Sequence, residues 1–288
     1  MVSTLFIFGN GFDLAHGLKT SYKDFFDHLR SSAEGKDLLE NLSWFNSSIA
    51  KELQKGEQAD WCNFEDGFSS LDLDAAKMMN SIYGKSGEDI VTNAFATVKA
   101  KLRAFVFHSY YKNAIQPIAK LPRENAYYIN FNYTPLLEDA YEIPESRILH
   151  IHGDAQRKEV LSLFGLSRDE HEIVFGGPID TASNLPKGII RETLIKDTYK
   201  LIPVLDTFLR GHPSDPITNI VVFGSSLSKA DRPYFYHLLK VYPNCHWTIY
   251  IHPEDESGAR LRAEDLKREA KVGTVAIVEE PNLLTLSF

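Results

Sequence analysis

The sequence has very few cysteines: Cys62 and Cys245 are its only two, and they form no Cys-x-x-Cys pair. Two thiols cannot build a disulfide scaffold or a four-cysteine zinc module, so we expect a reducing compartment. Long hydrophobic runs are also missing, and none approaches the roughly 20 apolar residues that cross a bilayer. The first apolar run is short and follows no basic segment, which predicts a core strand rather than a signal peptide. We therefore expect a cytoplasmic protein with no membrane association.

Basic residues are in deficit. The 31 lysines and arginines against 39 aspartates and glutamates give a formal net charge of -8. Binding to the phosphates of nucleic acids needs a basic face, so nucleic acid is a disfavoured partner. Hydrophobic residues make up 43% of the 288 residues, enough for a large core. We predict a single α/β domain over residues 1–288.

Short runs rich in Ile, Val, Phe and Tyr recur along the chain. Their apolarity is continuous rather than alternating, which is typical of strands buried on both faces of a parallel sheet. The runs lie at 4–8, 126–131, 147–151, 172–175, 218–223, 246–251 and 274–278. Helical patterns alternate with several of them, at 22–30, 189–209, 229–242 and 259–271. This alternation predicts a Rossmann-like fold with a mostly parallel sheet.

Residues 33–120 do not follow this alternation of strands and helices. They contain no clear strand, and apolar residues at helical spacing mark 93–111 as a helix. We interpret 33–120 as a large helical insertion between the first and second strands, packed over the carboxyl edge of the sheet. Ser21 is a capping candidate for the helix at 22–30.

The first strand runs into a glycine-rich turn that contains Gly9, Asn10, Gly11, Phe12 and Asp13. Glycines allow a sharp turn whose N–H groups can contact a phosphate or a ribose. Because Leu14 stands where the dinucleotide fingerprint needs its third glycine, the turn by itself is a weak signal.

Three further polar turns follow later strands, and ligands of open α/β sheets bind at this carboxyl edge. The three turns are Asn130-Phe131-Asn132-Tyr133-Thr134, His150-Ile151-His152-Gly153-Asp154 and Phe223-Gly224-Ser225-Ser226-Leu227. Since parallel strands all end at one edge, Asn132, His152 and Ser225 are predicted to converge there.

The motifs together resemble the AbiH family of bacterial abortive-infection proteins, whose members open with an apolar strand and Gly-Asn-Gly-Phe-Asp-Leu. The matching features are 9–18, Trp61-x-x-Phe64-Glu65, 130–134, 150–153 and 223–227, in the family's order. The resemblance implies antiphage defence, with a phage trigger or a defence protein as partner. A homo-oligomer is left open.

More distantly, the same motifs are similar to sirtuin-like NAD-binding domains. This resemblance implies a pocket that binds, and as an NAD glycohydrolase cleaves, NAD or a related nucleotide. His152 is then the general base toward ribose hydroxyls, and Asn132 contacts the nicotinamide ribose or a water. Asp13 and Glu65 are the candidates that stabilise the oxocarbenium-like centre. The implied cofactor-binding residues are Gly9, Asn10, Gly11, Phe12, Gly224, Ser225 and Ser226.

Two departures from the sirtuin pattern stand out. Two cysteines cannot form the zinc module of the deacetylases, which disfavours protein deacetylation. The sirtuin-like loop carries an aspartate two residues after its asparagine, and this chain has Thr134 there.

Structural interpretations compete with the catalytic ones. His16 is expected to cap or pack in the first turn, and Asn130 to be a satisfied turn residue. His150 and His152 alternate with Ile151, which predicts one shared strand face. No carboxylate or third histidine is evident at a matching spacing, so no metal is expected. The alternative functions are a non-catalytic module that senses a nucleotide or binds a partner and, less favoured, a nuclease effector.

Overall fold

The computed structural model describes residues 3–55, 72, 74–75, 78, 87–111, 115–155, 173–176, 195–211, 216–253, 258–270 and 274–279. The chain divides into two compact units. The sheet unit comprises Met1–Lys19, Val106–Ile173 and Thr198–Phe288. The helical unit comprises Thr20–Phe105 and Val174–Asp197. Among the described residues, no helix combines the length and the apolarity that a bilayer crossing requires.

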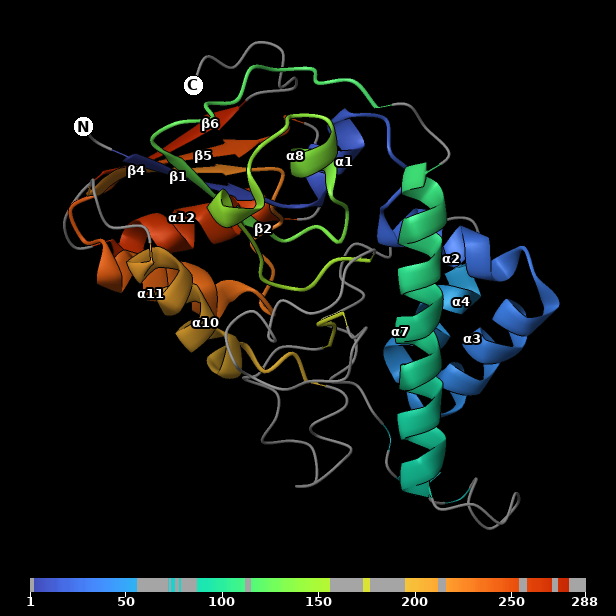
Figure 1. Ribbon diagram of the computed structural model, residues 1–288. Helices are drawn as coiled ribbons and strands as arrows, with labels where there is room; N and C mark the ends of the chain where they lie inside the picture. Colours follow the sequence, from blue (N-terminus) through green and yellow to red (C-terminus); the bar gives the residue numbers. More distant parts are fainter. Residues whose placement is uncertain are drawn as a thin grey trace. The chain divides into compact units, whose positions relative to one another are not determined.

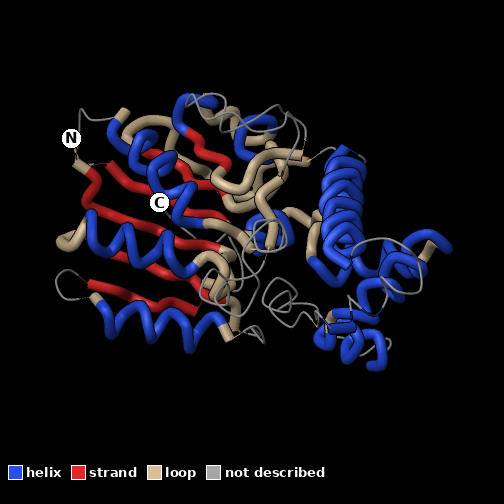
Figure 2. Tube along the Cα trace, turned by 90° about the horizontal axis from the view of Figure 1, so that it is seen from below, coloured by secondary structure: helices blue, strands red, loops and turns tan. Residues whose placement is uncertain are grey.

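The sheet unit is built on one six-stranded sheet in which every pairing is parallel, in the order β3-β2-β1-β4-β5-β6 (Figures 1 and 2). The strands are β1 (Ser3–Phe8), β2 (Ala126–Asn130), β3 (Ile148–His150), β4 (Ile217–Phe223), β5 (His246–Ile251) and β6 (Thr274–Glu279). The Rossmann-like α/β fold and six of the seven predicted strands are therefore confirmed.

The seventh predicted strand, at 172–175, is wrong. Residues 173–176 belong to no strand, and residue 172 lies outside the described part of the chain. Val174 and Phe175 belong instead to the helical unit, where the ring of Phe175 lies 6.0 Å from that of Tyr22. Both residues are buried, so the apolar run serves side-chain packing rather than strand pairing.

Right-handed crossovers decide which face of the sheet each helix covers. The connections that run from β3 to β4, β5 and β6 advance across the sheet in one direction, so α10 (Thr198–Arg210), α11 (Arg232–Val241) and α12 (Ala259–Glu269) share one face (Figure 1). The β2–β3 connection runs the opposite way and places α8 (Leu136–Asp139) on the other face. The sheet unit also contains α1 (Asn10–Ala15) and the 3-10 turn η2 (Glu145–Arg147).

The helical unit contains α2 (Tyr22–Arg30), α3 (Ala33–Phe45), α4 (Ser47–Lys55) and most of α7 (Gly87–Tyr111). The helices expected at 22–30 and 93–111 are thus confirmed. Ser21 caps α2 as predicted: its hydroxyl accepts a hydrogen bond from the N–H of Asp24, whose carboxylate accepts the N–H of Ser21 in return. Inside this unit, α2 packs on α7 through Phe25 and Phe105, whose ring centroids lie 5.6 Å apart.

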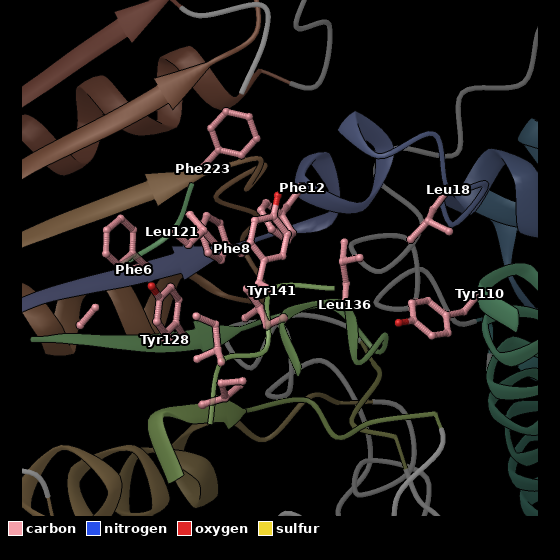
Figure 3. Close-up of a cluster of buried hydrophobic side chains, with 14 residues drawn as sticks. Phe6, Phe8, Phe12, Leu18, Tyr110, Leu121, Tyr128, Leu136, Tyr141 and Phe223 are labelled. Atoms are coloured by element: carbon pink, nitrogen blue, oxygen red, sulfur yellow. The ribbon is translucent and has the colours of Figure 1, made fainter. Parts of the chain in front are cut away.

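An aromatic core lies on the α8 face of the sheet (Figure 3). Phe6 and Phe8 of β1 alternate onto this face, because successive strand residues point to opposite sides. The ring of Phe8 stacks on Phe12 at 4.2 Å, and that of Phe6 stacks on Tyr128 of β2 at 5.2 Å. These contacts fix the end of β1 and the turn after it, so the glycine-rich turn has a rigid base.

His16 ends α1 as a structural residue, as the sequence predicts. Its Nδ1 lies 2.7 Å from the carbonyl oxygen of Phe12, and its Nε2 lies 2.7 Å from the hydroxyl oxygen of Tyr141. The carbonyl can only accept, so Nδ1 carries the proton and Nε2 accepts from Tyr141. Burial lowers the pKa of His16, although the Phe12 carbonyl opposes this shift. Folding therefore favours the neutral form of His16.

We predict that His16 makes the fold less stable in mild acid. The unfolded chain takes up this proton near pH 6.5, whereas the folded chain takes it up only at a lower pH. As the pH falls through that window the unfolded state binds more protons, so the free energy of unfolding decreases. Between pH 7.5 and pH 5.5, the urea midpoint should decrease more for the wild type than for His16→Gln. Equal decreases in both proteins would contradict the prediction.

Candidate functional site

The strand order reverses direction between β1 and β4, where one connection leads to β2 and the other to β5. The turns after these two strands meet there backbone to backbone. A Cβ added to Gly9 would lie 2.6 Å from the carbonyl oxygen of Gly224, and one added to Gly11 would lie 2.5 Å from the Cα of Gly224. Gly224 itself has φ +66°, a conformation that favours glycine. The glycines are therefore required by the close approach of the two turns.

The expectation that the N–H groups of Gly9 and Gly11 face a ligand is wrong. The N–H of Gly9 donates to the carbonyl of Phe223 at 3.0 Å, and that of Gly11 donates to the carbonyl of Gly224 at 2.8 Å. The N–H of Phe12 donates to the carbonyl of Gly9, also within the turn. The two glycine N–H groups thus fasten the β1 turn to the β4 turn. The turn does lie at the carboxyl edge, as the sequence predicts.

Asn132 joins this arrangement from β2. Its side-chain nitrogen donates to the carbonyl of Gly9 at 3.1 Å, and its own N–H donates to the side chain of Asn130 at 3.0 Å. The amide of Asn130 also donates to the carbonyl of Thr134 at 3.3 Å. Asn130 is therefore the satisfied turn residue that the sequence predicts, whereas Asn132 links the turns after β2 and β1.

Asp13 and Thr134 form a second link between the same two turns. The Thr134 hydroxyl lies 2.9 Å from each carboxylate oxygen of Asp13, and both side chains are buried. Asp13 lies on α1 and Thr134 lies after β2, so this contact joins segments that are far apart in the sequence.

His152 lies in the turn after β3 and packs against the α11 side of the edge. Its ring centroid lies 4.9 Å from that of Phe131 and 5.7 Å from that of Tyr234. Its Nδ1 lies 3.3 Å from the carbonyl oxygen of Phe131, and its Nε2 lies 3.3 Å from Asp231 Oδ1. The other oxygen of Asp231 accepts from the hydroxyl of Ser228 at 3.2 Å. Both ring nitrogens of His152 therefore face acceptor oxygens, and a neutral imidazole can donate to only one of them.

His150 faces the other side of the sheet, so the prediction that it shares a face with His152 is wrong. β3 ends at His150, and a turn closed by the N–H of Gly153 on the carbonyl of His150 breaks the strand alternation. His150 Nε2 lies 2.8 Å from Glu138 Oε1 on α8. Burial lowers the pKa of His150, but the hydrogen bond and the charge of Glu138, with the charge of Asp154, outweigh it and raise the pKa.

The histidine has carboxylate neighbours that the sequence did not reveal. Glu138, His150 and Asp154 each offer one ligand atom, and the three atoms lie within 4.8 Å of one another. The premise that no carboxylate lies near these histidines is therefore wrong. This cluster is hard to find from the sequence, because Glu138 reaches His150 only through the packing of α8 on the sheet.

The remaining predicted residues have varied positions. Ser225 is buried, and its hydroxyl accepts from the N–H of Leu227 at 3.1 Å; the carbonyl of Ser226 accepts from Arg262 at 2.7 Å. Phe12 is a core residue, and Asn10 is the first residue of α1. Glu65, Trp61 and Phe64 lie outside the described residues.

A continuous series of contacts joins the predicted turns. Asn132 reaches Gly9, Gly9 abuts Gly224 and Ser225, and His152 packs beside Phe131. Sequence reasoning missed Asp231, whose only signal was its place before Arg232-Pro233, where a helix begins. The edge therefore holds polar side chains from the turns after β1, β2, β3 and β4.

Comparison with known proteins identifies the family of this chain. A family model described as bacteriophage abortive infection AbiH matches residues 5–251, which is most of the chain and includes all four of these turns. No curated protein and no solved structure matches. The similarity to sirtuin-like NAD-binding domains stays a prediction from sequence. Because the matched region spans well over half of the chain, the chain belongs to the AbiH family of bacteriophage abortive infection proteins.

Proposed function

We propose that this AbiH protein acts in abortive infection by binding NAD or a related nucleotide at the carboxyl edge of its sheet and cleaving the N-glycosidic bond. The strand order β3-β2-β1-β4-β5-β6 carries the proposal. Parallel sheets with this order bind dinucleotides where the order reverses, outside the carboxyl ends of the strands. The motifs similar to sirtuin-like domains occupy that edge.

The proposed chemistry assigns a task to each turn. His152 accepts a proton from a ribose hydroxyl or from a water at Nε2 while its Nδ1–H donates to the Phe131 carbonyl, and the nearby carboxylate of Asp231 stabilises the imidazolium that forms. Asn132 holds the nicotinamide ribose or that water. The negative charge of Asp13, together with that of Glu65, favours the oxocarbenium-like centre that forms as nicotinamide leaves. The glycine turns and Ser225 with Ser226 line the rest of the nucleotide.

A specific observation favours the rival function, a module that binds a nucleotide or a partner without turnover. His152 is only 2% exposed and Asn132 only 5%. The N–H groups of Gly9 and Gly11 are already used between the turns. The experiment must therefore separate binding from cleavage.

Purified protein should be incubated with NAD. Free nicotinamide is then measured by chromatography, and NAD binding is measured by calorimetry. Nicotinamide release by the wild type and not by His152→Gln supports the hydrolase. Binding without release supports the rival module. The same assay on extracts of phage-infected cells that express the protein covers activity that needs a trigger. The proposal would be refuted if the protein neither bound NAD nor depleted it in either setting.

A further inference from the structure

We propose that Glu138, His150 and Asp154 bind a divalent transition-metal ion. Glu138 comes from α8, His150 ends β3 and Asp154 lies in the turn that follows. This inference does not depend on NAD chemistry, because a metal site in this place needs no nucleotide.

The spacing of the three ligand atoms suits one ion. They lie within 4.8 Å of one another, and two ligands bonded to a first-row metal at about 2.0–2.2 Å can be at most about 4.4 Å apart. A pair of ligand atoms at that limit would close by a few tenths of an ångström and would then lie opposite each other on the ion. One imidazole with two carboxylates is a mixed nitrogen and oxygen set that suits Mn²⁺ or Zn²⁺, with water in the other positions.

The hydrogen bonds of His150 give an independent reason. Its Nε2 lies 2.8 Å from Glu138 Oε1, and its Nδ1 lies 3.4 Å from the carbonyl oxygen of Asn132. Both oxygens are acceptors, but a neutral imidazole has a single N–H. With Nδ1–H directed to the backbone, Nε2 and the carboxylate of Glu138 can share either a proton or a metal ion. Metal-bound histidines commonly donate their second N–H to a backbone carbonyl in this way.

Charge and burial point the same way. The side chains of Glu138 and His150 are 7% and 8% exposed, and Asp154 is also buried. The formal charges of the three side chains sum to −2 with a neutral imidazole and to −1 with an imidazolium. A divalent ion brings the sum to zero when the imidazole is neutral. A proton shared by His150 and Glu138 is the competing arrangement.

The test is a titration of the chelator-treated full chain with Mn²⁺, in which binding is measured as loss of the free-ion EPR signal. A parallel titration with Zn²⁺ is measured by calorimetry. We expect one ion per chain, with affinity reduced at least about tenfold in His150→Gln and in Asp154→Asn. His237→Gln is the matched control, because His237 Nε2 lies 2.6 Å from Asp206 Oδ1 outside the cluster. This variant should bind like the wild type.

A measurement on the wild type alone guards against variants that fail to fold. Bound Mn²⁺ should show nitrogen modulation from one directly bonded imidazole in pulsed EPR. Absence of stoichiometric binding of both ions at millimolar concentration would overturn the proposal in favour of the shared proton. Wild-type affinity in folded His150→Gln and Asp154→Asn would overturn it as well, because the ion would then bind elsewhere.

Discussion

The His152→Ala variant should lose protection against phage while its melting temperature falls only by the modest amount that truncation of a buried side chain costs. Removal of a general base typically lowers a rate about 10²–10⁴-fold, enough to silence a toxic activity in an infected cell. If His152 is only structural, its loss leaves the Phe131 carbonyl and Asp231 without the imidazole, at roughly 1–3 kcal/mol of stability. Plaque counts and thermal melting on the same variant separate the two roles.

Two further variants sharpen this comparison. His152→Gln keeps much of the side-chain volume between Phe131 and Tyr234 but cannot relay a proton, so it should also lose protection. His237→Gln alters another histidine paired with a carboxylate and should keep protection. Full protection by a normally folded His152→Gln would remove His152 from the mechanism. Lost protection with a large drop in melting temperature would support the structural role.

Gly224→Ala should be among the most destabilising single substitutions in the sheet unit. Its Cβ would lie 2.5 Å from the nitrogen of Phe12 and 2.7 Å from the Cα of Gly11, which are backbone atoms that cannot rotate away. Overpacking of this kind costs about 1–3 kcal/mol, and the left-handed conformation adds about 1–2 kcal/mol. We expect a decrease of about 2–5 kcal/mol in the free energy of unfolding, measured by urea denaturation.

Gly17→Ala is the matched control. Gly17 has a similar positive φ of +75°, but a Cβ there would have nothing within 4 Å. This variant should lose only the backbone contribution of about 1–2 kcal/mol. The difference between the two variants therefore measures the contact between the β1 and β4 turns. Equal losses would show that this contact contributes little.

The fold was largely predictable from sequence because a parallel sheet covered on both faces needs continuous apolar strands. The runs that became β1, β2 and β4 carry this signal plainly. The run at 172–175 carries it too, and yet 173–176 are packed without strand pairing. Apolarity reports burial and does not distinguish a strand from a buried irregular segment.

The candidate site was predictable only in part, for a related reason. Strand ends predicted that Asn132 and His152 lie at one edge, since that follows from topology alone. The partners of each side chain depend on long-range packing: Glu138 reaches His150 from α8, and Asp231 reaches His152 from the start of α11. The alternation rule also failed at His152, because the strand ends two residues earlier.

The central position of β1 in the sheet has a consequence for synthesis on the ribosome. β1 pairs with β2 on one side and β4 on the other, so it leaves the ribosome early and acquires its second partner late. Roughly 200 residues separate β1 from β4, which at about 5–20 residues per second takes roughly 10–40 s of translation. During that interval one edge of an apolar strand lacks its native partner. Nascent chains that stop before Ile217 should therefore recruit chaperones or aggregate more than chains that extend through β6.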